Sequence, residues 1–273
     1  MPAAPWLLIV TAVTPVLTLL AFGLLTGITT ALFGFGGGFV VVPVIYMIAG
    51  DRADAMHVAV ATSTAVMIVN AAIATVAART VVRVHRRYLW PLIGFVAAGA
   101  LVGAPAAVHA TESFIHVVFI VYLVVTITDS IVRAGFLAVP DGAPRPLGGR
   151  VAVTGGIGIG IGVIASFLGV GGSVMTVPLL RRRGLPMAAA TALANPLTVP
   201  VAVIGTLVYA LVGDRVASGS IGYVDMLAAG VLLSTSLPTI VVTRRLVRHV
   251  PDRIHAYAYV TLLSMSLIAM LLV

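Results

Sequence analysis

The chain has 273 residues, of which 60% are hydrophobic and 9% are charged. Soluble globular domains carry about 25% charged residues, so the composition excludes a water-soluble domain and indicates a protein that lies mostly in a lipid bilayer. The net charge of +8 comes from sixteen arginines, with no lysine, against eight acidic residues. These arginines cluster at the ends of apolar stretches, which is a signal of membrane topology and not of nucleic-acid binding. The absence of cysteine excludes disulfides and thiolate metal sites, and no cofactor is expected.

Long apolar stretches follow one another along the chain, with short loops between them. A membrane helix needs about 20 apolar residues, and the alternating short strands of a membrane barrel are absent. We therefore predict an all-α polytopic membrane protein made of two inverted structural repeats of about five segments each, with broken or short re-entrant-like helices at two glycine motifs. The predicted segments are 6–33, 38–50, 55–78, 89–109, 113–135, 151–168, 173–180, 186–212, 221–243 and 254–273.

The arginines orient these segments. Cytoplasmic loops carry an excess of basic residues, so the four arginines between 79 and 87 mark that interval as cytoplasmic. Alternation from there puts fourteen arginines inside and only Arg52 and Arg215 outside. Both termini are then predicted on the outer side of a multi-pass protein of the cell inner membrane or plasma membrane.

One motif occurs twice in the sequence, 135 residues apart. Residues 34–43 read GFGGGFVVVP and residues 169–178 read GVGGSVMTVP. The interval after the first copy (51–54) is predicted outside and the interval after the second (181–183) inside, which makes the halves inverted. Matched interruptions in inverted halves indicate the binding site of a secondary transporter. We predict a first transmembrane repeat over 1–137, a cytoplasmic linker over 138–150 and a second repeat over 151–273.

Glycine-rich breaks of this kind can form an anion site without basic side chains. Glycine lets the backbone turn sharply, and a helix that restarts after the turn presents free N–H groups and a partial positive charge. We expect backbone amides for a small anionic substrate from both copies of the motif: Gly36, Gly37, Gly38, Gly171, Gly172 and Ser173.

Polar residues follow each motif at similar distances. Ala61-Thr62-Ser63 in the first half matches Ala190-Thr191-Ala192 in the second. Thr191 and Asn195 share a helix face at i, i+4 spacing, and we expect them to contribute to the site with Thr62 and Ser63. Asn70 is a further candidate, with helix–helix bonding as an equally weighted reading.

The remaining small and ionisable residues are given structural interpretations. The segments Gly99–Ala104 and Gly230–Thr235, and the alternating glycines of 156–162, predict close helix packing. Asp129 is expected to pair with Arg133, and His57 to be a structural interfacial histidine. His109, Glu112 and His116 are expected on the wet outer face, and none of these groups predicts a proton relay.

Two other functions remain open at this point. An intramembrane hydrolase would use Ser173 as the nucleophile and His57 or His116 as the base, but the first repeat has Gly38 where the second has Ser173. An anion channel could line a selectivity filter with the same glycine-rich backbone.

The duplicated glycine motif with its proline, the Ala61-Thr62-Ser63 segment and the Gly99–Ala104 segment together resemble the sulfite exporter TauE/SafE family, also called TSUP permeases. The resemblance covers essentially the whole chain and implies transport of sulfite, sulfoacetate, another sulfonate or thiosulfate. Family members often have Thr-Ser in the second half, where this chain has Thr191-Ala192. A coupling ion, H+ or Na+, is expected for uphill uptake, and the sequence leaves the direction of transport and the oligomeric state open.

Overall fold

A computed structural model describes residues 5–50, 52–84, 89–90, 92–132, 136, 151–212, 219–246 and 250–272, with the backbone alone for 5–13 and 151–154. The described residues form an all-α polytopic membrane protein, in which six helices are long and apolar enough to cross a bilayer. The helices are α1 (Pro5–Phe33), α2 (Gly38–Ala49), α3 (Ala55–Ala77), α4 (Arg79–Val84), α5 (Leu92–Val108), α6 (Glu112–Val132), α7 (Val151–Leu168), α8 (Ser173–Arg182), α9 (Met187–Val212), α10 (Met226–Leu246) and α11 (Asp252–Leu272). The strands are β1 (Ser220–Ile221) and β2 (Val224–Asp225).

Each predicted segment corresponds to one helix, because runs of apolar residues without charge have no stable alternative in a bilayer. The short helices α2 and α8 directly follow the two glycine motifs, as predicted. Arg79–Val84 forms a short extra helix, α4, inside the interval predicted as a cytoplasmic loop. The linker predicted over 138–150 lies outside the described residues.

Two boundaries were predicted wrongly. The segment expected to start at 221 begins instead with a β-hairpin, which turns at Gly222 (φ +57°) before α10 starts at Met226. Asp225 ends the hairpin and caps α10, since its Oδ1 accepts a hydrogen bond from the Ala228 amide at 2.9 Å. In addition, α8 continues through Arg182, so the loop predicted over 181–183 is largely helical.

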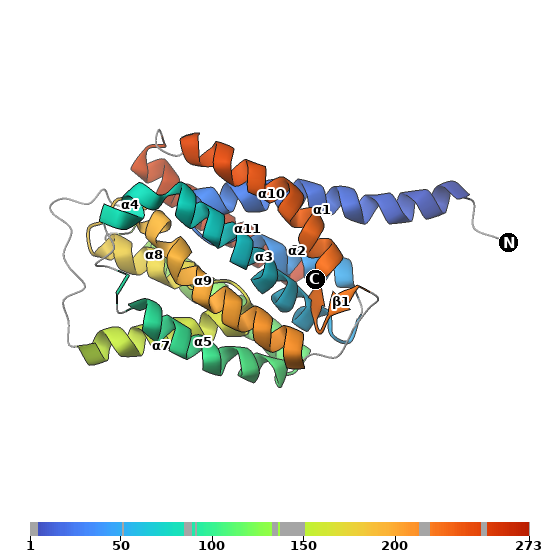
Figure 1. Ribbon diagram of the computed structural model, residues 1–273, viewed down its shortest axis with the longest axis horizontal. Helices are drawn as coiled ribbons and strands as arrows, with labels where there is room; N and C mark the ends of the chain where they lie inside the picture. The colour runs from blue at the N-terminus through green and yellow to red at the C-terminus, as the bar shows by residue number, and fades with distance from the viewer. Residues whose placement is uncertain are drawn as a thin grey trace.

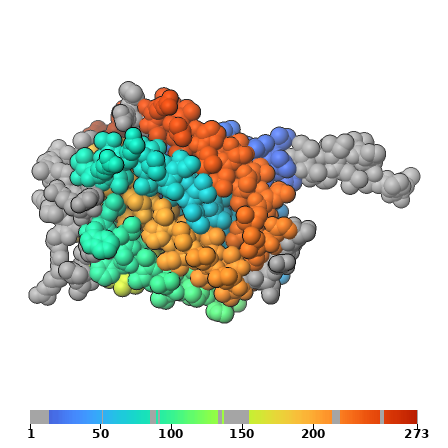
Figure 2. Space-filling view, viewed as in Figure 1, coloured from blue at the N-terminus to red at the C-terminus, as the bar shows by residue number. Residues whose placement is uncertain are grey.

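The helices pack reciprocally around a central pair (Figure 1). Helices α3 and α9 contact each other in the middle, with α10 packed on α3 and α5 packed on α9. On the outside of this group, α1 packs along α10 and α7 packs along α5. Figure 2 shows α3 and α9 crossing one face of the molecule between α10 and α5. These contacts therefore form two matching sets: α10 on α3 with α1 along α10, and α5 on α9 with α7 along α5.

Small residues allow the helix pairs α5–α7 and α1–α10 to approach closely, although not all of the small residues predicted for this role take part. A Cβ added at Gly99 or Gly103 would overlap backbone atoms of α7, and one at Gly162 would overlap the Val96 carbonyl of α5, as close packing requires. The prediction was wrong for three glycines, Gly156, Gly160 and Gly230, because a Cβ at any of these would meet nothing within 4 Å. On α1, Gly23 and Gly27 provide the close approach to α10 instead.

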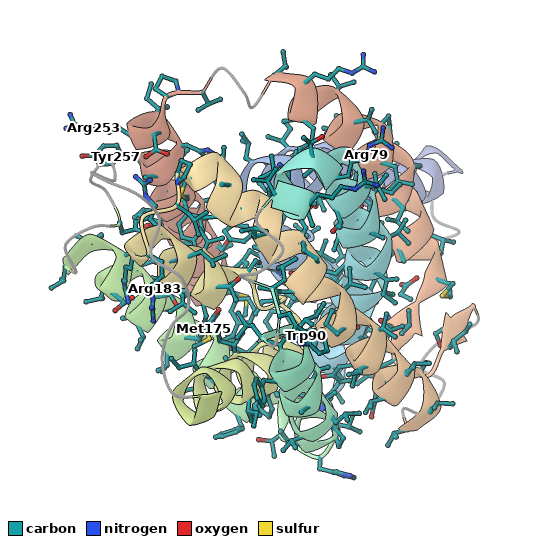
Figure 3. The ribbon with its side chains drawn as sticks, turned by 60° about the vertical axis from the view of Figure 1, so that its left-hand side comes forward. Arg79, Trp90, Met175, Arg183, Arg253 and Tyr257 are labelled. Carbon is teal, nitrogen blue, oxygen red and sulfur yellow. The ribbon has the colours of Figure 1, made fainter. Side chains whose placement is uncertain are left out.

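Several arginines gather at one end of the molecule, which is turned toward the viewer in Figure 3. Arg79 begins α4, Arg183 follows α8, and Arg253 lies in the first turn of α11. Arg79 and Arg253 are 174 positions apart in the chain. They lie at the same end because successive helices run back and forth along the bundle. Trp90, which is 73% exposed, and Met175 of α8 are labelled in the same view.

Candidate functional site

The two glycine motifs adopt matching backbone turns. Gly34 and Gly36 have φ values of +72° and +65°, and Gly169 and Gly171 have values of +65° and +66°. Residues other than glycine rarely adopt this left-handed region of backbone conformation. Glycine at these four positions therefore allows the same backbone turn in both motifs. The turns differ at the next residue, since Gly37 has a φ of +101° and Gly172 a helical φ of −70°.

The two turns lie against each other. A Cβ added at Gly38 would lie 2.7 Å from the Gly169 carbonyl oxygen and 2.8 Å from the Val170 Cα. Gly34 packs on the Thr191 carbonyl of α9, and Gly169 packs on Val60 of α3. Each turn is therefore enclosed by the central helix of the other half. Residues 34–45 and 169–174 are all buried.

Helices α2 and α8 begin at these turns. In α8 the first intrahelical bond runs from the Thr176 amide to the Gly172 carbonyl at 3.0 Å, so the amides of the first three residues precede the hydrogen-bond ladder. In α2 the amides of Val40 and Val41 both donate to the Gly37 carbonyl, and Gly38 donates to Phe35 at 3.4 Å. The start of α8 thus leaves more of its amides outside the ladder than the start of α2 does.

Two of the candidate polar residues hold the turns in place. Ser63 donates its hydroxyl to the Gly169 carbonyl at 2.7 Å, which joins α3 to the second turn. Asn70 donates to the Gly36 carbonyl at 3.3 Å and accepts from the Ser236 hydroxyl at 2.9 Å. Because carbonyls freed by a turn have no water to bond in a bilayer, these side chains stabilise the backbone of both motifs.

The other candidates occupy different surroundings. Asn195 donates to the Thr191 carbonyl at 3.3 Å, which confirms that the two residues share a face of α9 beside Gly34. The Thr191 hydroxyl donates to Ala188 within its own helix. Thr62 lies apart from the turns, since its hydroxyl accepts a hydrogen bond from the Asp225 amide in the hairpin at 3.0 Å.

Several buried polar atoms next to the turns have no hydrogen-bond partner. They are the hydroxyls of Thr26, Thr30 and Ser173 and the side-chain oxygen of Asn195, all on fully buried residues. Thr26 packs directly on Gly37, the residue before α2. Burying such a group without a bond costs about 1–3 kcal/mol, so the surroundings of the two turns hold several unsatisfied hydrogen-bonding atoms. The sequence analysis did not single out Thr26 and Thr30, because threonines within an apolar helix give no sign of what they face.

Carboxylates at the starts of α6 and α11 cap the two central helices. Glu112 accepts from the Met56 amide at 2.5 Å and contacts the His57 ring, which also bonds the Ala107 carbonyl at 3.1 Å. Asp252 accepts from the Met187 amide at 2.7 Å and forms an ion pair with Arg181. His57 is thus held between Glu112 and the Ala107 carbonyl, and Glu112 is a helix cap and not merely a solvated group.

Arg181 was expected in a loop and is instead 1% exposed. Its guanidinium donates to the carbonyls of Phe136 and Leu185 at 3.0 and 3.4 Å, in addition to its pairing with Asp252. The neighbouring Arg182 pairs with Asp129; Arg133, the partner predicted for Asp129, lies outside the described residues.

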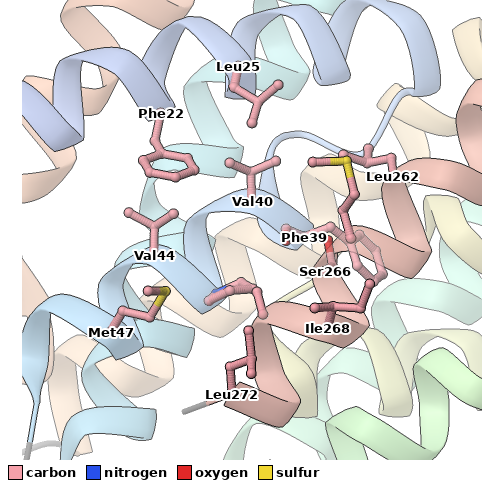
Figure 4. A pocket seen from close by; sticks show the side chains of 13 residues that line it. Phe22, Leu25, Phe39, Val40, Val44, Met47, Leu262, Ser266, Ile268 and Leu272 are labelled. Atoms are coloured by element: carbon pink, nitrogen blue, oxygen red, sulfur yellow. Dashed lines mark hydrogen bonds between the residues drawn. The ribbon is translucent and has the colours of Figure 1, made fainter.

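Two cavities flank the short helices. One of about 380 Å³ lies between α1, α2 and α11 and is almost entirely apolar (Figure 4). Phe22, Val44 and Met47 line it, and Ser266 is engaged by the Phe39 carbonyl at 3.0 Å. The other, of about 400 Å³, lies between α6, α7 and α8 and includes the Asp129–Arg182 pair. These cavities lie beside Pro43 and Pro178, respectively, and neither includes the glycines of the two turns.

A model of the sulfite exporter TauE/SafE family matches residues 19–270. The chain belongs to this family. The match includes both glycine motifs, every candidate residue named above, helices α2 to α10 in full and parts of α1 and α11.

Membership of the TauE/SafE family identifies the chain as a membrane transporter and places it among transporters rather than enzymes. It is a multi-pass membrane protein whose substrate is a small molecule. No curated protein matches the chain.

Proposed function

We propose that this TauE/SafE protein is a secondary transporter that moves a small anion, a sulfur-containing one such as sulfite, sulfoacetate or another sulfonate, by alternating access. The substrate site lies where the two glycine turns meet. The observation that carries the proposal is the contact between Gly38 and the Gly169 carbonyl, which brings the starts of α2 and α8 to one place. Helix N-termini attract anions through unbonded amides and a partial positive charge.

The surrounding atoms support an oxyanion as substrate. The unpartnered hydroxyls of Thr26 and Ser173 are buried beside the two helix starts and can donate to oxygen atoms of a ligand. Ser63 and Asn70 keep the turns rigid through their bonds to Gly169 and Gly36. A site of amides and hydroxyls needs no buried basic side chain, because each donor contributes part of the compensating charge.

The reciprocal packing of the helices supports alternating access. Each half encloses the turn of the other through its central helix, α3 or α9. Rocking of one repeat against the other would then open the same site first to one side and then to the other. We take the two halves to be the predicted repeats over 1–137 and 151–273. Both turns are buried in the present conformation.

A hydrolase is the less favoured alternative, since the imidazoles it would use are engaged elsewhere. His57 contacts Glu112 and the Ala107 carbonyl, and His116 bonds the Met270 carbonyl at 2.8 Å. An anion channel would use the same turns without rocking, and flux measurements separate the two.

The proposal is tested first by binding. Purified protein is heated with sulfite, sulfate, thiosulfate, sulfoacetate, taurine, acetate or chloride, because a ligand of the folded state raises the apparent Tm. We expect a shift for sulfur oxyanions or sulfonates that is lost in Gly172→Val. The matched control is Gly156→Val, where an added Cβ meets open space. No shift with any of the sulfur anions would contradict the assignment.

Transport is then measured in proteoliposomes with the anion that binds. Saturable flux and counterflow of labelled substrate are expected for alternating access, whereas a current that rises without saturation would establish the channel. Imposed H+ and Na+ gradients test for a coupling ion, since either gradient should accelerate uptake if that ion is cotransported.

A further inference from the structure

Met67 lies at the point where the two glycine turns meet. It belongs to the central helix α3 and is fully buried. A Cβ added at Gly36 would lie 3.1 Å from the Met67 Cγ, and one added at Gly38 would lie 3.0 Å from its sulfur. At Gly171, in the other turn, the corresponding distance to the sulfur is 3.3 Å. One side chain therefore touches three glycines from both motifs.

Thr198 of α9 lies against the same turns. A Cβ added at Gly36 or Gly171 would be 3.1 or 2.8 Å from the Thr198 Cγ2. The Thr198 hydroxyl donates to the Ala194 carbonyl of its own helix at 3.1 Å, and a β-branched side chain in a helix has one or two rotamers. Thr198 is thus a fixed wall beside the turns.

Met67 differs from Thr198 in its freedom to move. Methionine is unbranched, with three rotatable bonds and a polarisable sulfur, and it fills irregular gaps. Its thioether occupies the space next to Gly38 and Gly171. In the proposed site, an anion that contacts the first amides of α2 and α8 would need this space. A bound ligand must displace this side chain, and the room that it vacates limits the size of the ligand.

We propose that Met67 is the size-determining residue of the anion site, and that it restricts the substrate to a small oxyanion of about the dimensions of sulfite. This inference rests on the proposed function. Met67 acts by steric exclusion between the turns, with Thr198 as the opposite wall. Shortening Met67 enlarges the site and admits anions with a bulkier group on the sulfur.

The test compares binding of sulfite and benzenesulfonate, by thermal shift, in wild type and variants. In Met67→Ala we expect the preference for sulfite over benzenesulfonate to fall about tenfold or more, the range that one or two methylene groups confer in an apolar pocket. Met67→Leu, which keeps the volume, should retain the preference. Met270→Ala is the matched control, because Met270 is equally buried but lies in α11.

The outcomes separate this inference from the function on which it rests. If wild type binds sulfite, Gly172→Val does not, and Met67→Ala keeps the wild-type preference, the role of Met67 is refuted while the site remains. If no sulfur anion binds wild type or any variant, both proposals fail. Should Met67→Ala not fold, Met67→Val still removes the sulfur and the terminal methyl group that lie beside Gly38 and Gly171, and an unchanged preference in that variant also overturns the inference.

Discussion

The difference between Gly37 and Gly172 leads to a prediction about stability. These residues are equivalent in the two motifs and both precede a short helix. Gly37 has a φ of +101° and Gly172 a φ of −70°. A Cβ at Gly37 would overlap the Thr26 methyl group, while one at Gly172 would meet Ile161 Cγ2 at 3.0 Å and Val96 Cγ1 at 3.9 Å. Alanine should therefore be tolerated at one position and not at the other.

The expected magnitudes follow from these contacts. At Gly37, a left-handed backbone costs an L-residue about 1–2 kcal/mol, and overpacking against Thr26 adds about 1–3 kcal/mol. Gly37→Ala should then destabilise the protein by about 2–5 kcal/mol. Gly172→Ala has no backbone cost of this kind, and exchange of glycine for alanine before a helix costs about 1 kcal/mol.

A second substitution isolates the steric part. Thr26→Ser removes the methyl group that Gly37→Ala would strike and keeps the hydroxyl. In the double variant, most of the overpacking cost of about 1–3 kcal/mol should be recovered, while the backbone cost remains. The recovery is the coupling energy of a double-mutant cycle between contacting residues.

The assay is reversible unfolding in mixed micelles, titrated with a denaturing detergent and followed by far-UV circular dichroism. Wild type, both alanine variants, Thr26→Ser and the Thr26→Ser/Gly37→Ala double variant are compared at one protein concentration. Equal destabilisation by Gly37→Ala and Gly172→Ala would refute the assigned backbone geometry. A double variant no more stable than Gly37→Ala would refute the contact with Thr26.

Two further predictions use the same unfolding assay. Asp252→Asn should destabilise the protein by about 3–5 kcal/mol, because it removes the carboxylate charge that faces the buried Arg181 guanidinium. Combining it with Arg181→Met should restore part of that loss, and no restoration would argue against the pair. Gly162→Ala should be strongly destabilising, because its Cβ would overlap the Val96 carbonyl of α5. Gly160→Ala has open space around the added Cβ and should stabilise α7 by up to about 1 kcal/mol. Similar effects of the two substitutions on stability would contradict the packing of α7 on α5.

Much of the fold follows from local properties of the sequence. In a bilayer, an uncharged apolar run of sufficient length forms a helix because its backbone groups have no other partners. That is why ten segments could be predicted and why each corresponds to one helix. The duplicated glycines likewise predict two sharp turns, because only glycine readily takes the positive φ found at Gly34 and Gly169. The family resemblance, carried by the same motifs, is confirmed by the match over 19–270.

The partners of polar side chains were decided by tertiary structure. Thr62 and Ser63 are adjacent, yet Ser63 bonds the second turn at Gly169 and Thr62 bonds the hairpin at Asp225. Neighbouring residues on a helix point about 100° apart, so their surroundings depend on which helices lie on each side. Both residues were predicted to face the site, and in the structure each hydroxyl forms a hydrogen bond with a backbone group of the protein.

The burial of Arg181 also depends on tertiary structure and could not be predicted from the sequence. By sequence it belongs to a run of three arginines, a pattern typical of a solvated loop, and Arg182 and Arg183 are partly exposed. Asp252, 71 residues away, supplies the charge that allows Arg181 to be buried. The sequence by itself determined where the helices and turns occur, because hydrophobicity and glycine act locally. Only tertiary structure decided which side chains meet at the turns, since that depends on contacts between segments far apart in the chain.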